Sequence, residues 1–369
     1  MLHFTRTWTD HDRRFVQAYR ERGAETAVVI LRTTTAGIRG DIEDLGVARV
    51  ASLDLEPPFS QSQLEATVAD YRRLEASYAP EVVMAGPLTD CAFIKAAAAT
   101  RVPWIAQSWA FDVFWEPDRS PEARSRVEHV LQVCEALFAD CQAVAARCAD
   151  LGYRTSQPLL VVPWGLERAW TIDVPARSRS RSALGVEGKQ VFVHTRGFEP
   201  IHDPLALIAA WKGAAAVPPA RHLLLLGDGL LRREMAEAVE QHGLADSVTL
   251  AGRVSRQEME RVMRAADFYV SSSRCDGTSV SLLEAMGAGL PPIVTNLGGN
   301  PEWVSHENNG WMVPPGAPEE LGAAIVQAGR LDHARRLEIA ETNARLIAIR
   351  ANWTQNADRL LAFIRRVRG

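Results

Sequence analysis

Short apolar runs alternate with amphipathic stretches along this chain, and no other feature constrains its fold as strongly. Runs with the composition of buried strands occur in the first half at 2–5, 27–32, 47–53, 81–86, 103–108, 137–140 and 158–163. The alternation restarts later, with runs at 190–196, 222–227, 247–252, 268–273 and 291–296. Strands of this kind, separated by single helices, are typical of βαβ units around a parallel sheet. The pattern therefore predicts an α/β fold.

The chain is too long for a single core. It has 369 residues, and single cores stop growing at about 250–300 residues. Residues 163–189 are rich in Pro, Gly, Ser and Arg, so we predict an interdomain linker there, with the arginines of the 177–181 run in solvent. We therefore expect two doubly wound, Rossmann-like domains facing each other across a cleft, with the strand ends of both at one site.

Composition excludes several classes of function. The formal net charge of −4 gives no indication of nucleic-acid binding. No apolar segment precedes the charges at the N-terminus, and no run approaches the ~18 apolar residues of a membrane span, so we expect a cytoplasmic protein. The five cysteines are an odd number without a CxxC or Cys/His cluster, which favours free thiols over disulfides or a metal site.

The segment CDGTSVSLLEAMG, from Cys275 to Gly287, carries two carboxylates around a predicted helix start at Val280 or Ser281. Free N–H groups and the helix dipole at such a start favour a phosphate. Glu284 has a carboxylate that can accept hydrogen bonds from two vicinal hydroxyls, as on a ribose. An alternative is that Asp276 caps a turn and Glu284 pairs with an arginine. The nearby GDG at 227–229 is only a weak dinucleotide signal, because the last glycine of GxGxxG is missing.

A resemblance adds to this interpretation. The stretch DGTSVSLLEAMGAGLPPIVTNLGGNPEWV, followed by NGWMVPPG, resembles the retaining glycosyltransferases of family 4, which have the GT-B fold. Their signature is an acid, seven residues, then Glu. VFVHTRGFEPIHDPLALIAAW and VTLAGRVSRQEMERVMRAADFYVSSS extend the similarity, and VMAGPLTD and IAQSWAFDVF match more loosely. The resemblance implies an acceptor-binding domain at 1–165, a donor-binding domain at 166–350, and a final helix at 351–369 that packs back on the first domain.

Site residues follow from the same resemblance by position. Arg196 matches the arginine that binds the donor diphosphate, and Glu284 matches the ribose-binding glutamate. Asp276 replaces the more usual glutamate. His202 stands where the family usually has lysine, and Trp109 stands where many members have histidine, with Asp112 retained on the acceptor side. The remaining expected donor contacts are Gly252, Arg253 and Val254 at the base, and Gly277, Thr278, Ser279 and Val280 at the sugar and phosphates.

The resemblance implies retaining transfer of a sugar from a nucleotide-diphosphate sugar to an acceptor hydroxyl. UDP-sugar is the first choice of donor and GDP-sugar the second. The acceptor is a sugar, a lipid-linked molecule or a natural product, and neither metal nor cofactor is expected. Peripheral attachment at the inner membrane face is an alternative to a purely cytoplasmic location. Two other functions stay open: a UDP-sugar epimerase on this fold, and a non-catalytic nucleotide-sugar-binding subunit, suggested by His202 and Trp109.

Overall fold

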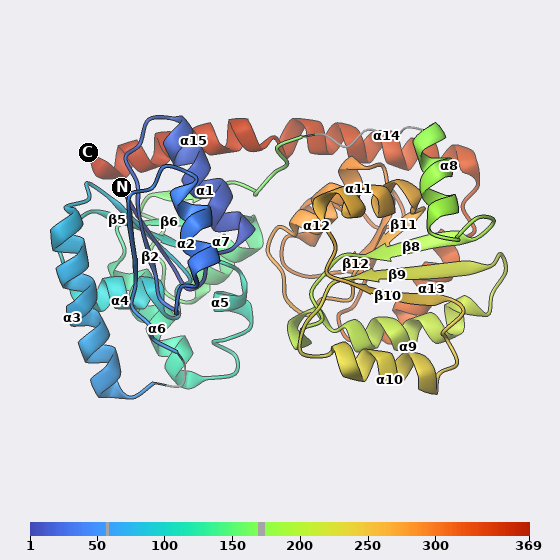
Figure 1. Ribbon diagram of the computed structural model, residues 1–369, viewed down its shortest axis with the longest axis horizontal. Coiled ribbons are helices and arrows are strands. Elements are labelled where there is room, and N and C mark those ends of the chain that lie inside the picture. The colour runs from blue at the N-terminus through green and yellow to red at the C-terminus, as the bar shows by residue number, and fades with distance from the viewer. Residues whose placement is uncertain (57–58, 169–173) are drawn as a thin grey trace. The chain divides into compact units, whose positions relative to one another are not determined.

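The computed structural model describes residues 1–56, 59–168 and 174–369. It forms two compact units, one made of Met1–Pro163 with Thr354–Gly369 and the other of Trp164–Trp353. Each unit is built on its own parallel sheet with helices on its faces (Figure 1). The α/β class and the two doubly wound domains are therefore confirmed. That the domains face each other across a cleft stays a prediction.

The first unit contains a sheet of seven parallel strands in the order β3-β2-β1-β4-β5-β6-β7. The strands are β1 (Leu2–Thr5), β2 (Ala27–Ile30), β3 (Arg49–Ser52), β4 (Val83–Ala85), β5 (Trp104–Gln107), β6 (Ala136–Ala139) and β7 (Leu159–Val161). The helices are α1 (Asp10–Glu21), α2 (Ala36–Glu43), α3 (Gln61–Tyr78), α4 (Cys91–Ala98), α5 (Phe111–Phe114), α6 (Pro121–Val133), α7 (Gln142–Asp150) and the C-terminal α15 (Trp353–Arg368).

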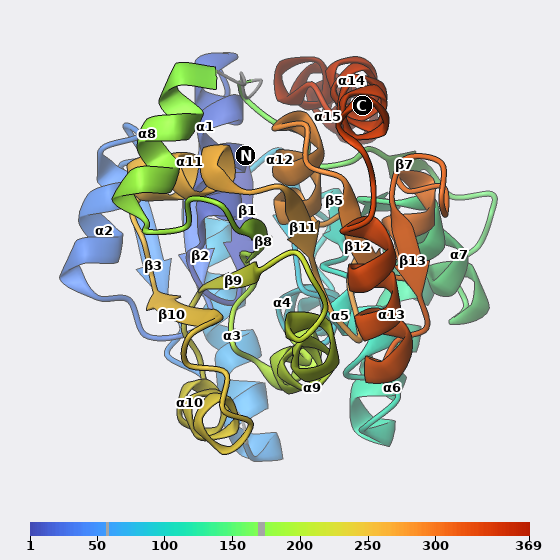
Figure 2. The same cartoon turned by 90° about the vertical axis from the view of Figure 1, so that its right-hand side faces the viewer.

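The second unit contains six parallel strands in the order β10-β9-β8-β11-β12-β13. Figure 2 shows α8, α11, α12 and α14 on one face of this sheet and α9, α10 and α13 on the other. The strands are β8 (Gln190–His194), β9 (Arg221–Leu226), β10 (Val248–Gly252), β11 (Phe268–Val270), β12 (Pro292–Thr295) and β13 (Trp311–Val313), the last not predicted from the sequence. The α-helices are α8 (Val174–Ala183), α9 (Pro204–Ala215), α10 (Arg232–Gln241), α11 (Arg256–Ala265), α12 (Val280–Gly287), α13 (Pro318–Ala328) and α14 (His333–Arg350), and short 3-10 turns span η1 (Pro200–His202) and η2 (Asn300–Glu302).

Both faces of the second sheet are buried, which explains why its strands are almost continuously apolar. Successive residues of a strand point to opposite faces. Phe192 and Leu225 therefore lie in the core beneath α9 and α13, whereas Val193 and Leu224 lie in a separate core beneath α11 and α12. An alternating polar pattern would leave one of these two cores unfilled.

The linker prediction for 163–189 is wrong over part of its length. Residues 174–183 form α8, which packs on α11, while 169–173 lie outside the described residues. The arginines are not simply in solvent. Arg177 and Arg181 donate to the two carboxylate oxygens of Asp267, at 2.7 and 3.1 Å. Composition alone suggested a linker because the acid that receives these arginines lies about 90 residues further along the chain.

The strand orders place a topological switch point in each unit. Successive strands build outward in one direction from β1 and in the other from β4, and the second sheet does the same from β8 and β11. In open parallel sheets, ligands bind outside the carboxyl ends of the strands at such a point. Ligands are therefore expected to bind at the loops that follow β1, β4, β8 and β11.

Candidate functional site

Arg196 and Asp276 meet at the switch point of the second unit. Arg196 follows β8 and Asp276 follows β11. The guanidinium Nη2 lies 2.9 Å from the Asp276 carboxylate, and the two side chains are 15% and 13% exposed. Nη1 donates to the Ser279 hydroxyl at 3.0 Å. Three residues expected to bind the donor are thus brought together by segments far apart in the chain.

Helix α12 begins at Val280, as predicted, with its amino end beside this cluster. Ser279 is its N-cap, and the Ser279 hydroxyl accepts from the Leu282 backbone N–H. The same hydroxyl accepts from Arg196, so one side chain joins the fixed cation to the helix start. A guanidinium beside free helix N–H groups is an arrangement that favours an anion with several oxygens.

Asp276 is held in a partly desolvated position. Burial raises the pKa of its carboxyl group, and the Arg196 guanidinium opposes that shift. The carboxylate therefore depends on Arg196 to remain ionised. An anionic ligand that binds Arg196 competes with Asp276 for the same donors, so ligand binding and the state of Asp276 are coupled.

His202 lies against the same guanidinium. Its Nδ1 is 3.4 Å from Arg196 Nη2 and 3.4 Å from the Ser273 hydroxyl. Burial and the neighbouring Arg196 lower the pKa of His202 to about 2. The imidazole is therefore neutral at ordinary pH.

Two glycines set the shape of the loop after β11. A Cβ on Gly298 would lie 1.8 Å from the Asp276 carbonyl oxygen, and Gly298 has φ +50°. A Cβ on Gly299 would lie 2.7 Å from the Gly277 carbonyl oxygen. The Gly-Gly pair before η2 therefore lets two backbone segments touch, and that contact positions residues 276–279.

Glu284 of α12 pairs with Arg256 of α11. Its carboxylate lies 3.2 Å from Arg256 Nη1, with Glu284 13% exposed and Arg256 63% exposed. The arginine pairing that we considered as an alternative is therefore present. A pair with an exposed arginine contributes little to stability.

The expected base-binding residues follow β10. Gly252 is buried with φ +73°, whereas Arg253 is exposed. A Cβ on Gly252 would lie 3.2 Å from Arg232 Nη1. Arg232 was missed by the sequence analysis. Its only signal is a cation at the first position of the helix that follows the GDG turn.

The first unit repeats this arrangement at its own switch point. Arg6 follows β1 and pairs with Asp90, which follows β4. Arg6 also lies 3.0 Å from a Glu116 carboxylate oxygen and donates to the Thr89 hydroxyl at 2.9 Å. The sequence analysis did not identify Asp90, because it lies at a helix start and resembles an ordinary cap. It also did not identify Glu116, because Glu116 lies 110 residues from Arg6 in the chain.

Asp112 and Trp109 form a structural loop after β5. The Asp112 carboxylate is fully buried and accepts from Leu88 N (2.8 Å), Ser108 Oγ (2.7 Å) and Trp109 N (3.0 Å). Burial raises the pKa of Asp112 to about 7. The Trp109 ring lies 5.9 Å from the His11 ring. Asp112 thus holds the loop in place, and a role in sugar contact stays a prediction for both residues.

Three further features of the described part of the chain bear on function. All five cysteines are buried free thiols. In residues 1–56, 59–168 and 174–369, no three His, Cys, Asp or Glu side chains lie together as a metal site would require. Within those same ranges, no helix combines the length and apolarity needed to cross a bilayer.

Part of the chain matches a known protein family. Residues 189–329 match the family model of the glycosyl transferases group 1. The D-inositol 3-phosphate glycosyltransferase of Segniliparus rotundus is 27% identical over 63% of this chain, and the match spans about half (52%) of that protein. A GDP-mannose-dependent α-(1-6)-phosphatidylinositol monomannoside mannosyltransferase of Mycobacterium tuberculosis is 23% identical over 80% of this chain and 78% of that protein.

The solved structures agree on the fold. Anabaena HepE in complex with UDP and glucose superposes with a TM-score of 0.82 at 19% identity, covering 98% of both chains. This likeness spans both units, whereas the family model falls within the second. Residues 189–329 are thus similar to the group 1 glycosyltransferases, and the chain has the GT-B fold.

Proposed function

We propose that this protein is a retaining glycosyltransferase that moves a sugar from a nucleotide-diphosphate sugar to an acceptor hydroxyl. The observation that carries the proposal is the cluster of Arg196, Asp276 and Ser279 at the amino end of α12. In this role Arg196 and the helix N–H groups bind the diphosphate and neutralise the charge that develops as it leaves, which is electrostatic stabilisation of the transition state. Asp276 and Glu284 hold hydroxyls of the sugar and the ribose.

UDP-sugar is the proposed donor. HepE has been crystallised with UDP, whereas the mycobacterial mannosyltransferase is named for GDP-mannose. Donor choice therefore varies among proteins similar to this one, and a direct comparison of nucleotides decides it. The acceptor binds the first unit in this proposal, where Arg6, Asp90 and Glu116 offer one guanidinium and two carboxylates to hydroxyl groups.

A non-catalytic nucleotide-sugar-binding subunit is the second candidate. The observation that favours it is His202, which is neutral beside Arg196 in place of a lysine. A neutral imidazole gives a developing diphosphate charge less support than a fixed cation. Replacing His202 with lysine distinguishes the two functions. In an enzyme, His202→Lys should raise the turnover of the donor sugar. In a binding subunit, the variant should still show no turnover.

The test is a thermal-shift panel of UDP, GDP, ADP and TDP, with NAD⁺ as a control, followed by donor-sugar turnover with the preferred nucleotide. One nucleoside diphosphate should stabilise the protein and lose its effect in Arg196→Ala. A folded protein that responds to none of the four would contradict the proposal. Nucleotide binding without sugar transfer or hydrolysis would favour the binding subunit.

A further inference from the structure

A cavity lies in the first unit, at the opposite edge of the sheet from the Arg6 cluster. Its volume is about 550 Å³, within the range of about 300–1,000 Å³ that is usual for small-molecule sites. It is lined by the amino ends of β1, β2 and β3, by the segment between α3 and β4, and by the last turns of α15. The cavity is therefore separate from the carboxyl edge of the sheet, where the acceptor is proposed to bind.

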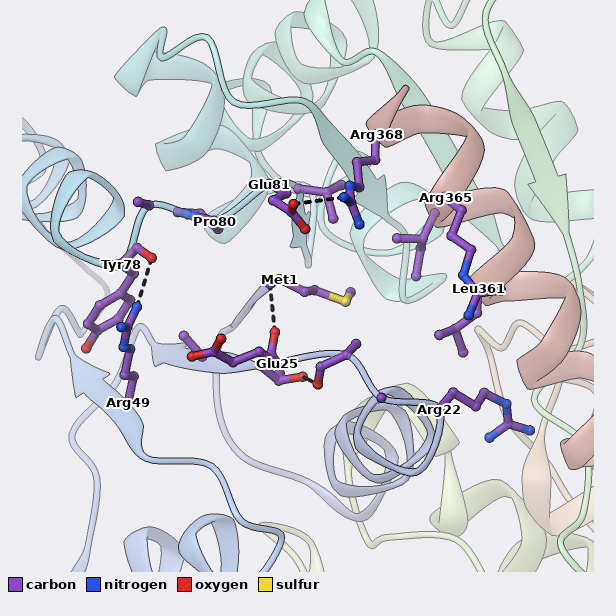
Figure 3. A pocket seen from close by; sticks show the side chains of 17 residues that line it. Met1, Arg22, Glu25, Arg49, Tyr78, Pro80, Glu81, Leu361, Arg365 and Arg368 are labelled. Atoms are coloured by element: carbon purple, nitrogen blue, oxygen red, sulfur yellow. Dashed lines mark hydrogen bonds and ion pairs between the residues drawn. The ribbon is translucent and has the colours of Figure 1, made fainter.

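Four arginines line this cavity from three parts of the chain: Arg22, Arg49, and the α15 pair Arg365 and Arg368. Figure 3 shows Arg365 and Arg368 on one wall, with Arg49 and Tyr78 on the wall facing them. Only two carboxylates, Glu25 and Glu81, line the same space. The lining side chains are therefore net positive in a protein whose formal net charge is −4.

The four arginines differ in how many of their N–H groups form hydrogen bonds or ion pairs within the protein. Arg368 pairs with Glu81 at 2.8 Å, and Arg22 pairs with Asp358 at 2.7 Å. Arg49 donates to the Tyr78 carbonyl at 2.9 Å, which leaves most of its N–H donors unused. Among the described residues, the Arg365 side chain makes no hydrogen bond or ion pair. Basic residues favour a helix C-terminus, which accounts for charge on α15 but not for Arg49 on the facing wall.

The two carboxylates restrict the kind of anion that fits. Like charges repel, so Glu25 and Glu81 disfavour a bare polyphosphate. Carboxylates accept hydrogen bonds from hydroxyls, and guanidinium groups bind phosphate oxygens in pairs. Leu361, Ile364 and Val82 add an apolar surface against which a ligand's carbon skeleton can pack. The wall therefore suits a phosphate and hydroxyls carried by one molecule.

We propose that this cavity binds a phosphorylated polyol, with its phosphate at Arg365 and its hydroxyls at the carboxylates. Two sources carry this chemistry: a soluble sugar or glycerol phosphate, and the headgroup of a glycerol-bearing phospholipid. Because α15 forms part of the wall, an occupant also ties the last helix of the chain to the first unit. The site is independent of the proposed donor site, since every lining residue belongs to the first unit.

The experiment titrates the full chain with glucose 6-phosphate and with glycerol 3-phosphate, with saturating UDP present so that the donor site is filled. Inorganic phosphate and glucose are the comparison ligands, and vesicles of phosphatidylglycerol or phosphatidylcholine test the lipid source. Arg365→Ala removes the unused cation. Arg366→Ala is the matched control, because Arg366 is exposed on the same turn, lies over Phe363 and does not line the cavity.

We expect saturable binding that Arg365→Ala weakens by about tenfold or more, and Arg366→Ala by less than about twofold. Arg49→Gln should also weaken it, and inorganic phosphate should bind less tightly than either polyol phosphate. Binding confined to phosphatidylglycerol vesicles, with the same dependence on Arg365, supports the lipid source. Equal losses in the two α15 variants, or no binding of either source to folded protein, would overturn the proposal. Loss of UDP binding in Arg196→Ala should leave the polyol phosphate titration unchanged.

Discussion

At the scale of single residues, one substitution can separate the two roles proposed for Asp276. Its carboxylate forms an ion pair with the Arg196 guanidinium at 2.9 Å. In the proposed enzyme it also accepts a hydrogen bond from a sugar hydroxyl. Asp276→Asn removes the competing charge, so nucleoside diphosphate affinity should be equal or higher. Transfer should fall by about tenfold to a hundredfold, because a hydrogen bond to a charged group is worth about 1.5–3 kcal/mol. Titration calorimetry with UDP and initial rates measure the two effects. Parallel losses of both would contradict separate roles.

His202 gives a pH prediction at the same scale. Its pKa is lowered to about 2 in the folded protein, against about 6.5 in an unfolded chain. The unfolded state therefore binds a proton that the folded state does not. The stability that this difference contributes is complete above pH 6.5 and is lost as the pH falls, by about 1.4 kcal/mol per pH unit.

His202→Gln should remove that loss. Between pH 7 and pH 5 the original protein should lose about 2 kcal/mol more free energy of unfolding than the variant. Urea denaturation at a series of pH values measures it. The exposed His333 serves as the control, since His333→Gln should retain the acid sensitivity of the original protein. Identical pH profiles for all three proteins would show that His202 is not held neutral.

At the scale of elements, Gly298 shows how a loop before η2 fixes a loop before α12. A Cβ at this position would meet the Asp276 carbonyl oxygen at 1.8 Å, so Gly298→Ala must move residues 276–279. Gly185 is the matched control, because it also has positive φ, +64°, but has nothing within 4 Å of an added Cβ. Gly185→Ala should cost only about 1 kcal/mol of stability. Gly298→Ala should cost more and should also weaken UDP binding by at least about tenfold, as measured by titration. Similar behaviour of the two variants would contradict a positioning role for this contact.

The elements also show what a sequence can predict. Strands with both faces buried are recognisable from their continuous apolar composition, so the two sheets were predicted. The start of α12 at Val280 was also predicted, from the polar turn that precedes it. Pairings between distant segments were not. Asp267 receives Arg177, Arg181 and Arg336, at 2.7, 3.1 and 3.2 Å, and no local pattern relates these positions. Glu116 was not predicted for the same reason, because its partner Arg6 is 110 residues away in the chain. The proximity of Arg196 and Asp276 was implied by resemblance and not by spacing.

At the scale of the whole molecule, the chain carries two sheets, each with its own core and each with an Arg–Asp pair at its switch point. A ligand that binds one unit should stabilise mainly that unit. UDP at 100 times its Kd should add about 2.7 kcal/mol to the second unit, which is roughly 5–10 °C for a domain of that size.

Differential scanning calorimetry tests this division directly. UDP should raise the transition of the second unit and leave that of the first nearly unchanged, and Arg196→Ala should abolish the shift. A polyol phosphate should act on the other transition, and Arg365→Ala should abolish that effect alone. If a single shared transition were seen instead, and each ligand raised it, the two units would be unfolding as one cooperative body. The two sites would then be coupled through the protein, because a ligand that stabilises a shared folded state favours binding at every site that requires it.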